Sequence, residues 1–547
     1  MQVPFLFLKP LNYQVSMKKR FVGFVLYMLM AWGIQGQVPT NQYFSKEIPE
    51  KADKELQFFA FFINQGVASN MYAKSEFLKG QVVGRLFGSN TTTTSDSLTS
   101  KYFEQRLIPF FIYQPKLFNG KALLRASFEI DWTWGDAAYG VGGNLGSGIS
   151  ADQVNLQTQN IEIELNPSKG WFINLGLQRL FDTPYNPYRT VFDKMTTTGY
   201  RLAYWGTDGV GISVRKDWDF SRIKAGYYQL YENATEQDDD VSLFELTGEK
   251  DISRAWKWGL SAYWLRDRAA GKGGVSILGQ GLNSLLSSYN GTYFFRYGDV
   301  PYKADIYWLG TFFGRNTEHW LDPWMVTGFL NVNLGKADTL LNKTISQSQW
   351  TKANDFLGFA ANLRVSYRYG QTLSDAVTLD MLYSSGDADG LRDGRYSGVI
   401  TGNQWASPGA IFISSGSYIL MPHGNVVNRF TPAVCDISNM GFGLTAGTLT
   451  FSKGIIPNRL NAKVGSAFAL SNVQPKGGGF IMGTELNGAI MYNFGPFMSL
   501  ELHGAYLMLG DFYDSKENSH GSAVNGELDK RPTNPWTAFV VFKWLMF

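Results

Sequence analysis

The final segment, Trp536–Phe547 (WTAFVVFKWLMF), is almost entirely aromatic or aliphatic and ends the sequence on Phe547. In lipid every backbone polar group must find a partner within the protein, and only helices and closed β-barrels achieve this. Aromatic and β-branched residues favour strands over helices. We therefore expect this segment to be the closing strand of a membrane barrel.

Alternating residues support that interpretation. From Leu124 to Trp134 every even-numbered residue is apolar, and the odd-numbered residues are Arg, Ser, Glu, Asp and Thr. A period of two is the signature of a strand with two different faces. The same alternation recurs at residues 363–369, 377–384, 485–494 and 498–508. In a barrel the polar face lines the lumen and the apolar face meets lipid.

The composition of the 547 residues agrees, with 15 % aromatic residues, 17 % charged residues and 59 glycines. Beyond residue 37 no apolar run is long enough for a membrane helix, which needs about 18 residues or more. A net charge of +3 without a basic stripe gives no reason to expect a nucleic-acid partner. The single cysteine, Cys435, excludes a disulfide within the chain. The sequence predicts an all-β protein, a transmembrane antiparallel up-and-down barrel of about 18 strands, with roughly 16 to 20 as the range.

The first residues are typical of a secretion signal. Lys18, Lys19 and Arg20 precede the apolar stretch Phe21–Trp32, and Gly36 offers a small residue for cleavage before Gln37. Met17 is a more natural start than Met1, since the sixteen residues before it fit no signal pattern. We expect a signal segment at 1–36, a short periplasmic lead at 37–54 and the barrel at 55–547.

Turn residues suggest which strands are joined tightly. Phe118–Lys121, Asn166–Gly170 and Thr207–Gly209 contain Asn-Gly, Asn-Pro or Asp-Gly pairs, which favour tight turns. Other connections, such as 336–354 and 386–439, are long and polar. Short turns on one rim and long extracellular loops on the other are typical of outer-membrane barrels.

The inward faces of these strands carry charges of both signs. The candidate pore-lining residues are Arg125, Glu129, Asp131, Arg201, Arg215, Arg364, Arg368, Asp380, Glu485 and Glu501. Two interpretations stay open. The bases select anions, with Arg364 and Arg368 as the best contacts, or the charges pair across neighbouring strands and fill the lumen.

Other chemistry has weaker support. Asp387, Asp389 and Asp393 form a weak candidate loop for Ca²⁺, but their spacing does not match an EF-hand, and a solvated loop is favoured. We therefore predict no metal and no cofactor. His503 shares a strand face with Ser499 and Glu501, which leaves a barrel hydrolase as the weakest alternative. We expect no enzyme, since no nucleophile elbow or metal motif is present.

Three stretches resemble bacterial outer-membrane porins, and especially the alginate-export-like barrels of Bacteroidetes-type bacteria. They are NLGLQRLFD at 174–182 with its return strand at 192–206, SSGDADGLRDG at 384–394, and LELHGAYLMLGDFYD at 500–514. Leu177 stands where that family usually has Arg. The resemblance implies a channel in the cell outer membrane for a hydrophilic, anionic or saccharide solute.

The terminal strand ending on Phe547 also resembles the signal read by the barrel-assembly machinery, a predicted partner alongside outer-membrane lipid. We expect a porin-like passive channel. The alternative is a closed barrel with a loop-filled lumen that serves as a binding or scaffold protein.

Overall fold

The fold is described from a computed structural model. It covers residues 54–73, 86–87, 92–134, 155–180, 207–231, 239–270, 297, 300–317, 319, 321–341, 349–400, 416–421, 433–434, 437–515, 517–519, 522–523 and 531–546. The predicted signal segment, Cys435, Arg201 and Phe547 lie outside these residues.

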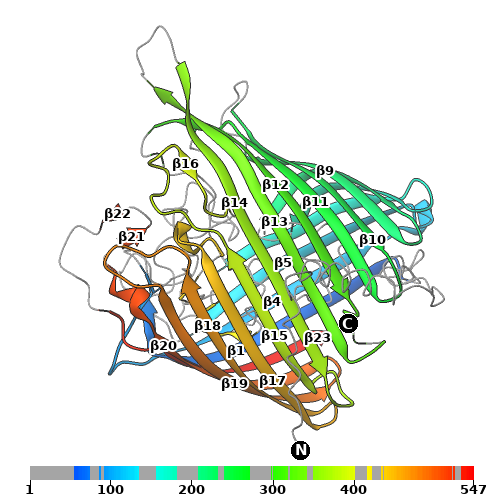
Figure 1. Ribbon diagram of the computed structural model, residues 1–547. Helices are drawn as coiled ribbons and strands as arrows, with labels where there is room; N and C mark the ends of the chain where they lie inside the picture. The colour runs from blue at the N-terminus through cyan, green and yellow to red at the C-terminus, as the bar shows by residue number, and fades with distance from the viewer. Residues whose placement is uncertain are drawn as a thin grey trace, which may run out of the picture.

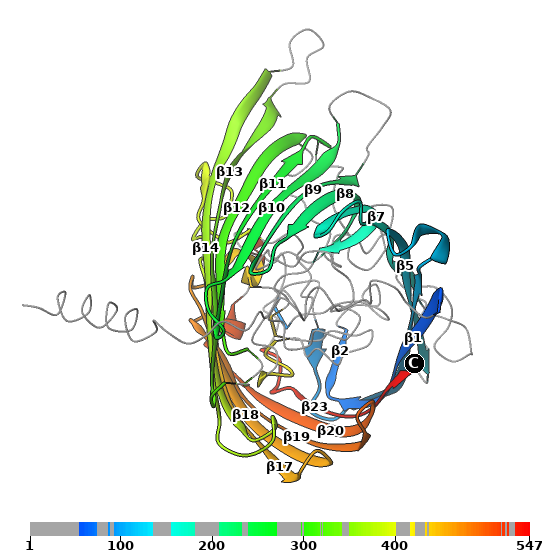
Figure 2. The same cartoon turned by 90° about the vertical axis from the view of Figure 1, so that its right-hand side faces the viewer.

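Within the described residues, 18 antiparallel strands form one closed ring, which confirms the predicted architecture and the favoured strand number (Figures 1 and 2). The strands, in ring order, are β1 (Leu56–Ser69), β4 (Ser100–Tyr113), β5 (Ala122–Trp134), β6 (Asn155–Leu165), β7 (Trp171–Leu180), β8 (Thr207–Asp217), β9 (Ser221–Tyr231), β10 (Val241–Asp251), β11 (Trp256–Asp267), β12 (Tyr302–Arg315), β13 (Trp324–Leu341), β14 (Gln349–Arg368), β15 (Ala376–Ser384), β17 (Leu444–Ile456), β18 (Leu460–Ser471), β19 (Ile481–Gly495), β20 (Met498–Leu509) and β23 (Trp536–Met546).

The ring closes between its first and last strands. β1 pairs with β4 on one side and with β23 on the other, from Ala60 opposite Met546 to Ser69 opposite Thr537. Every other ring strand pairs with its neighbours in the sequence, so the topology is up-and-down. Closure removes the open edges that lipid would not tolerate.

The remaining described elements are short. β16 (Arg395–Tyr396) pairs in parallel with β14. Two short antiparallel pairs are formed by β2 (Met71–Ala73) with β3 (Thr92–Thr94) and by β21 (Glu517–Ser519) with β22 (Ser522–Ala523). Three 3-10 helices are η3 (Lys116–Phe118), η5 (Asn439–Gly441) and η6 (Asp511–Asp514). No helix in the described part of the chain is long and apolar enough to span a membrane.

The two rims differ as the sequence predicted. Tight turns join β4 to β5 and β6 to β7 on the rim where both ends of the ring lie, which we take as the periplasmic rim. Asn119 and Gly120 have φ of 48° and 79° in the first of these turns. Asn and Gly tolerate this left-handed conformation, so this Asn-Gly pair fits the turn.

Two predicted connections were wrong. Thr207–Gly209 begins β8, because Thr207 and Asp208 pair with Leu180 and Arg179 of β7. The 336–354 connection is mostly strand, since pairing between β13 and β14 continues to Leu341 opposite Gln349. This end of the hairpin extends beyond the rim of the barrel, so both faces of its strands meet water. The apolar–polar alternation that marks a strand in the sequence is therefore missing there.

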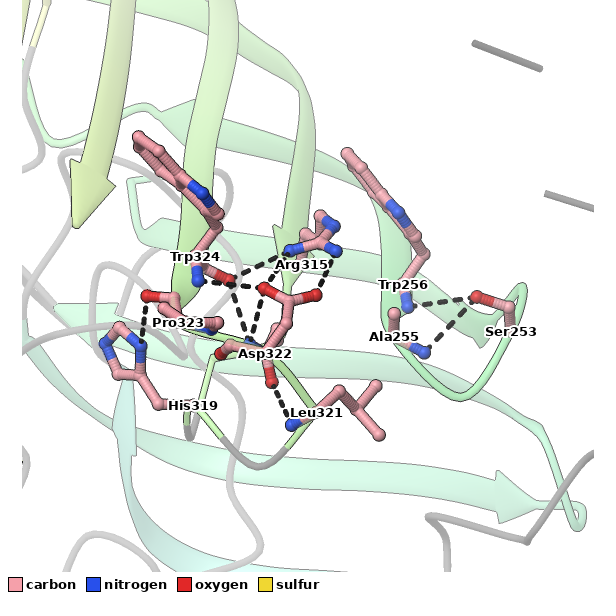
Figure 3. A network of polar contacts seen from close by, with 10 residues as sticks. Ser253, Ala255, Trp256, Arg315, His319, Leu321, Asp322, Pro323 and Trp324 are labelled. Atoms are coloured by element: carbon pink, nitrogen blue, oxygen red, sulfur yellow. Dashed lines mark hydrogen bonds and ion pairs between the residues drawn. The ribbon is translucent and has the colours of Figure 1, made fainter. Parts of the chain in front are cut away.

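The turn between β12 and β13 shows how the periplasmic rim is held (Figure 3). The Asp322 carboxylate pairs with the Arg315 guanidinium and accepts the Trp324 backbone N–H at 2.8 Å. Asn316, with φ of 50°, accepts the Leu321 N–H at 3.0 Å. The His319 Nδ1 lies 3.2 Å from the Pro323 carbonyl oxygen. These contacts satisfy backbone groups that have no ladder partner.

The outer and inner faces of the ring have opposite character. Outward side chains such as Leu246, Leu309 and Leu502 are exposed apolar residues, whereas inward ones include the buried Arg125, Asp131 and Glu245. Near the long-loop rim, outward aromatic rings contact one another across neighbouring strands. The contacting pairs are Tyr227 with Phe244, Phe244 with Trp264, and Trp264 with Tyr307. An apolar exterior bordered by aromatic residues is the signature of a barrel in lipid.

Candidate functional site: the lumen wall and the loop seated on it

One half of the inner wall carries a ladder of ion pairs that starts on β4 and β5. Arg106 lies 2.7 Å from the Glu129 carboxylate and 2.8 Å from that of Asp131. Arg125, fully buried, lies 3.1 Å from Glu162 and 3.0 Å from Glu164 on β6. Each guanidinium therefore binds two carboxylates, and the alternation of each strand places all of these groups on one face.

The ladder continues across β8, β9 and β10. Asp217 pairs with Arg215 at 3.1 Å and with Arg222 at 2.8 Å. Lys224 donates to Glu245 at 2.7 Å, and the Tyr228 hydroxyl donates to the same carboxylate at 2.8 Å. These contacts join the strands into one polar surface.

Carboxylates outnumber bases on this surface, which we call the charged ladder. Its bases are Arg106, Arg125, Arg215, Arg222 and Lys224, and its carboxylates are Glu104, Glu129, Asp131, Glu162, Glu164, Asp217, Glu245 and Glu249. Each base has carboxylate partners, so this half of the wall presents more negative than positive charge to the lumen.

The other predicted bases lie elsewhere. Arg364 of β14 binds the buried Asp380 of β15 through its Nε at 2.7 Å, and the Asn362 amide donates to the other oxygen of Asp380 at 2.7 Å. Arg368 is the last residue of β14, at the periplasmic rim. Its backbone N–H donates to the Pro323 carbonyl. The structure thus brings Arg364 to a carboxylate and places Arg368 at the end of its strand.

The opposite half of the wall holds a segment of the long connection between β15 and β17. Residues 416–421 lie against β19, where the buried Glu485 carboxylate accepts the backbone N–H groups of Tyr418, Ile419 and Leu420 at 2.7, 2.9 and 2.7 Å. The Ser417 hydroxyl donates to it at 2.8 Å. A carboxylate that accepts several N–H groups is a strong, charge-assisted anchor.

The Tyr418 side chain continues this contact onto β20 and β23. Its hydroxyl lies 3.2 Å from Nδ1 of His503, whose Nε2 lies 2.9 Å from Glu501. Its ring packs edge-on against Phe539, with centroids 5.7 Å apart. The Lys463 ammonium lies 4.9 Å from the centre of the Tyr418 ring. Polar and aromatic contacts from four strands thus hold one tyrosine, and we call this site the Tyr418 seat.

Apolar loop residues pack beside the seat. Ile419 and Leu420 are fully buried, and their carbonyl groups accept the N–H groups of Ala433 and Val434. Further along the wall, the Trp308 indole N–H donates to the Ile400 carbonyl at 2.8 Å. Loop segments therefore occupy part of the lumen on this side and narrow it.

Sequence reasoning missed Tyr418, Arg106 and Lys543. Lys543 lies 3.0 Å from Glu501 on the neighbouring strand. Arg106 and Lys543 follow the alternation of their strands, so that pattern could have found them. Tyr418 lies in a loop without periodicity, and its only signal is the short apolar run that it begins, Tyr418–Met421.

The aspartate-rich loop is held by hydrogen bonds between its own residues, and these centre on Asp387. The Asp387 carboxylate accepts the N–H groups of Asp389, Gly390 and Ser397 at 3.1, 2.6 and 2.7 Å. Burial raises the pKa of Asp387, but these donors and the Ser397 hydroxyl bring the pKa below its ordinary value. Over the described ranges, no group of three or more His, Cys, Asp or Glu side chains is placed to hold a metal ion.

Within the described residues, Ser499, the serine that shares a strand face with His503, is hydrogen-bonded to Glu501. The Ser499 hydroxyl donates to Glu501 at 3.1 Å, and the two ring nitrogens of His503 face Glu501 and Tyr418. A serine hydrolase needs its serine within hydrogen-bond reach of the histidine. The contacts of His503 instead belong to the Tyr418 seat.

A closed ring with an apolar exterior, aromatic borders and a charged interior defines the class of the molecule. The chain is an outer-membrane β-barrel.

Comparison with known proteins gave similarity only at the level of solved structures. No family model and no curated protein matches the sequence. OccAB1 of Acinetobacter baumannii has a TM-score of 0.46 at 10 % identity, with 91 % of this chain and 99 % of that chain covered. OpdK and OccK5 (OpdH) of Pseudomonas aeruginosa have TM-scores of 0.44 and 0.43 at 11 % and 9 % identity, each covering 90 % of this chain and 98 % of theirs.

Proposed function

We propose that this barrel is a porin-like channel through which a hydrophilic solute diffuses passively. The observation that carries the proposal is the charged ladder: thirteen ionisable side chains line up on the inner face of β4–β10. A dry core does not tolerate so many charges, whereas a water-filled lumen hydrates them. A narrowing made by loop backbone inside the ring fits passive diffusion of a small solute.

The charges on the wall bear on the class of solute. The resemblance to alginate-export-like barrels implies an anionic or a saccharide solute. An anion would meet a ladder in which carboxylates outnumber bases, and the Arg364 guanidinium is bound to Asp380. A neutral saccharide avoids that repulsion and exchanges hydrogen bonds with paired carboxylates and bases. We therefore favour a neutral saccharide, and membership of the alginate-export-like barrels remains a prediction.

Liposome swelling tests this proposal. Purified barrel in liposomes is exposed to a neutral sugar, the uronate of the same sugar and its amino derivative, which have similar size and different charge. We expect the neutral and amino sugars to enter faster than the uronate. Heat-denatured protein is the control. Uronate entry faster than that of the neutral sugar would refute the solute class, and no entry of any solute would refute the channel.

The second candidate is a closed barrel that acts as a binding or scaffold protein. The Tyr418 seat and the contact between Trp308 and Ile400 favour it, because both place loop backbone inside the ring. Under this alternative, releasing the loop should open no pathway. The channel proposal requires that release of the loop widens an existing pathway, so the Glu485 variant described below separates the two.

A further inference from the structure

The outward face of β10–β14 changes character sharply below the long-loop rim. Cross-strand pairing places Phe244, Trp264, Tyr307, Leu334 and Leu357 in one row across these strands. Tyr and Trp lie at the membrane interface, where an apolar ring body and a polar tip are both satisfied. This row therefore marks the outer boundary of the hydrocarbon layer.

A second row lies two residues closer to the long-loop rim on β11–β14, and its side chains alternate between basic and acidic. The pairing runs from Arg266 to Asp305, from Asp305 to Lys336, from Lys336 to Asp355, and from Asp355 to Arg395 of β16. Lys336, Asp355 and Arg395 are exposed. The row stands where lipid headgroups replace hydrocarbon.

The next row up is basic. Lys303 pairs in register with Asp338, and Asp338 with Lys352. The Lys303 ammonium lies 4.8 Å from the centre of the Trp350 ring, and Lys352 lies 2.5 Å from Asp355. Arg268, directly after β11, donates to Asp305 at 2.9 Å.

We call these two rows the basic shelf. It contains six bases and three carboxylates, namely Arg266, Arg268, Lys303, Lys336, Lys352 and Arg395 with Asp305, Asp338 and Asp355. The bases of the shelf thus outnumber its carboxylates two to one, just above the aromatic row. Along each row a carboxylate on one strand separates the bases on the two neighbouring strands.

A groove on the outer face lies beside Leu357, two residues below Asp355 on β14. It has a volume of about 460 Å³ and is lined by the apolar side chains of Val332, Leu357, Phe359 and Tyr383. Ser385, Ser397 and Asn472 line its polar part. An apolar groove on a lipid-facing wall, with charge above it, matches an amphiphile that has chains below and an anionic head above.

We propose that the basic shelf binds the phosphate-bearing headgroup of an outer-leaflet glycolipid, with an acyl chain in the groove at Leu357. The charge of the shelf complements phosphate, and its height matches the headgroup layer. Lys and Arg at such a surface strengthen binding to anionic lipid, and salt weakens that binding. The site lies on the outside of the ring and does not depend on what passes through the lumen.

The test compares two triple variants of the full-length barrel. Lys303→Gln/Lys336→Gln/Lys352→Gln alters the shelf, and Lys121→Gln/Lys169→Gln/Lys250→Gln makes the same charge change near the periplasmic rim, where all three lysines are exposed. Binding of lipid A and of dephosphorylated lipid A is titrated in neutral detergent by native mass spectrometry. Inorganic phosphate serves as a competitor, and heat-modified electrophoresis checks folding.

We expect the shelf variant to bind lipid A on the order of a hundredfold more weakly than the unaltered barrel, because each lysine near an anionic lipid surface strengthens binding about fivefold. The periplasmic variant should bind normally, and dephosphorylated lipid A should bind all three proteins equally weakly. Lipid A binding by the shelf variant at normal affinity, equal loss in both variants, or displacement of lipid A by millimolar inorganic phosphate would overturn the proposal. Should the shelf variant not fold, Lys336→Gln alone is expected to weaken lipid A binding about fivefold, and unchanged binding would overturn the proposal.

Discussion

The carboxylate of Glu485 lies 2.7 Å from the backbone nitrogen of Tyr418, although 67 residues separate them in the sequence. The strand residue is on the wall and the tyrosine is on a loop, so this contact fastens the loop to the inside of the barrel. Two further N–H groups reach the same carboxylate. The Glu485 carboxylate is therefore a main contact that sets the position of this loop inside the lumen.

Glu485→Gln should loosen the loop. The amide has one acceptor oxygen where the carboxylate has two charged ones, so at least one of the three N–H groups loses its partner. A hydrogen bond to a charged group contributes about 1.5–3 kcal/mol. We expect larger and noisier single-channel currents than for the unaltered protein. Glu55→Gln, which changes an exposed carboxylate outside the lumen, is the matched control and should leave the currents unchanged.

Tyr418 variants separate the hydroxyl from the ring. Tyr418→Phe keeps the packing against Phe539 and removes the contact with His503, which costs about 1 kcal/mol. Tyr418→Ala removes both. Protease accessibility of the loop should rise slightly for Phe and strongly for Ala. Equal accessibility of all three proteins would show that the side chain does not hold the loop.

Arg125→Met should destabilise the barrel. It leaves Glu162 and Glu164, both buried, without the guanidinium that lies 3.1 and 3.0 Å away. Breaking a buried ion pair from one side costs about 3–5 kcal/mol. Urea unfolding followed by tryptophan fluorescence measures the loss. Lys101→Met on the outer face of β4 is the control, with a change within about 0.5 kcal/mol. A similarly small effect of Arg125→Met would mean that water already screens this pair.

The turn between β14 and β15 should respond to acid. The Thr372 backbone N–H and the Gly454 N–H donate to Asp375 at 2.9 and 3.0 Å, and they lower its pKa to about 2. Because this folded-state pKa is below the unfolded value of about 3.9, the stabilisation is complete above pH 4. It is lost as the pH falls through 2.

Asp375→Asn should accordingly lower the unfolding temperature at pH 7, and the difference from the unaltered barrel should shrink between pH 4 and pH 2. Melting curves across this range measure it, with Asp96→Asn, an exposed loop aspartate, as the control. A difference that stays constant down to pH 2 would rule out the carboxylate as its source.

The sequence predicted the ring well because alternation is a local property. The pattern at Leu124–Trp134 became β5, and the apolar terminal segment became β23, which closes the ring. Local pattern failed where both strand faces meet water, as in the hairpin of β13 and β14. It also failed at Tyr418, since the contact with Glu485 joins residues far apart and depends on how a long loop folds.

Inward parity located Arg125, Asp131 and Arg215 on the charged ladder, but it gave no partners. The two carboxylates on Arg125 come from β6, and their contact depends on the register between β5 and β6. A shift of one residue would turn those carboxylates toward lipid. Which charges meet on the inner wall therefore depends on how neighbouring strands are aligned, and the sequence alone does not specify that alignment.

Single-channel recording in a planar lipid bilayer tests the central claim most directly. Purified barrel should give discrete current steps, and a salt gradient should give a reversal potential that favours cations, because carboxylates outnumber bases on the charged ladder. A bilayer that stays silent with folded protein, including the Glu485→Gln variant, would contradict a water-filled path through the ring.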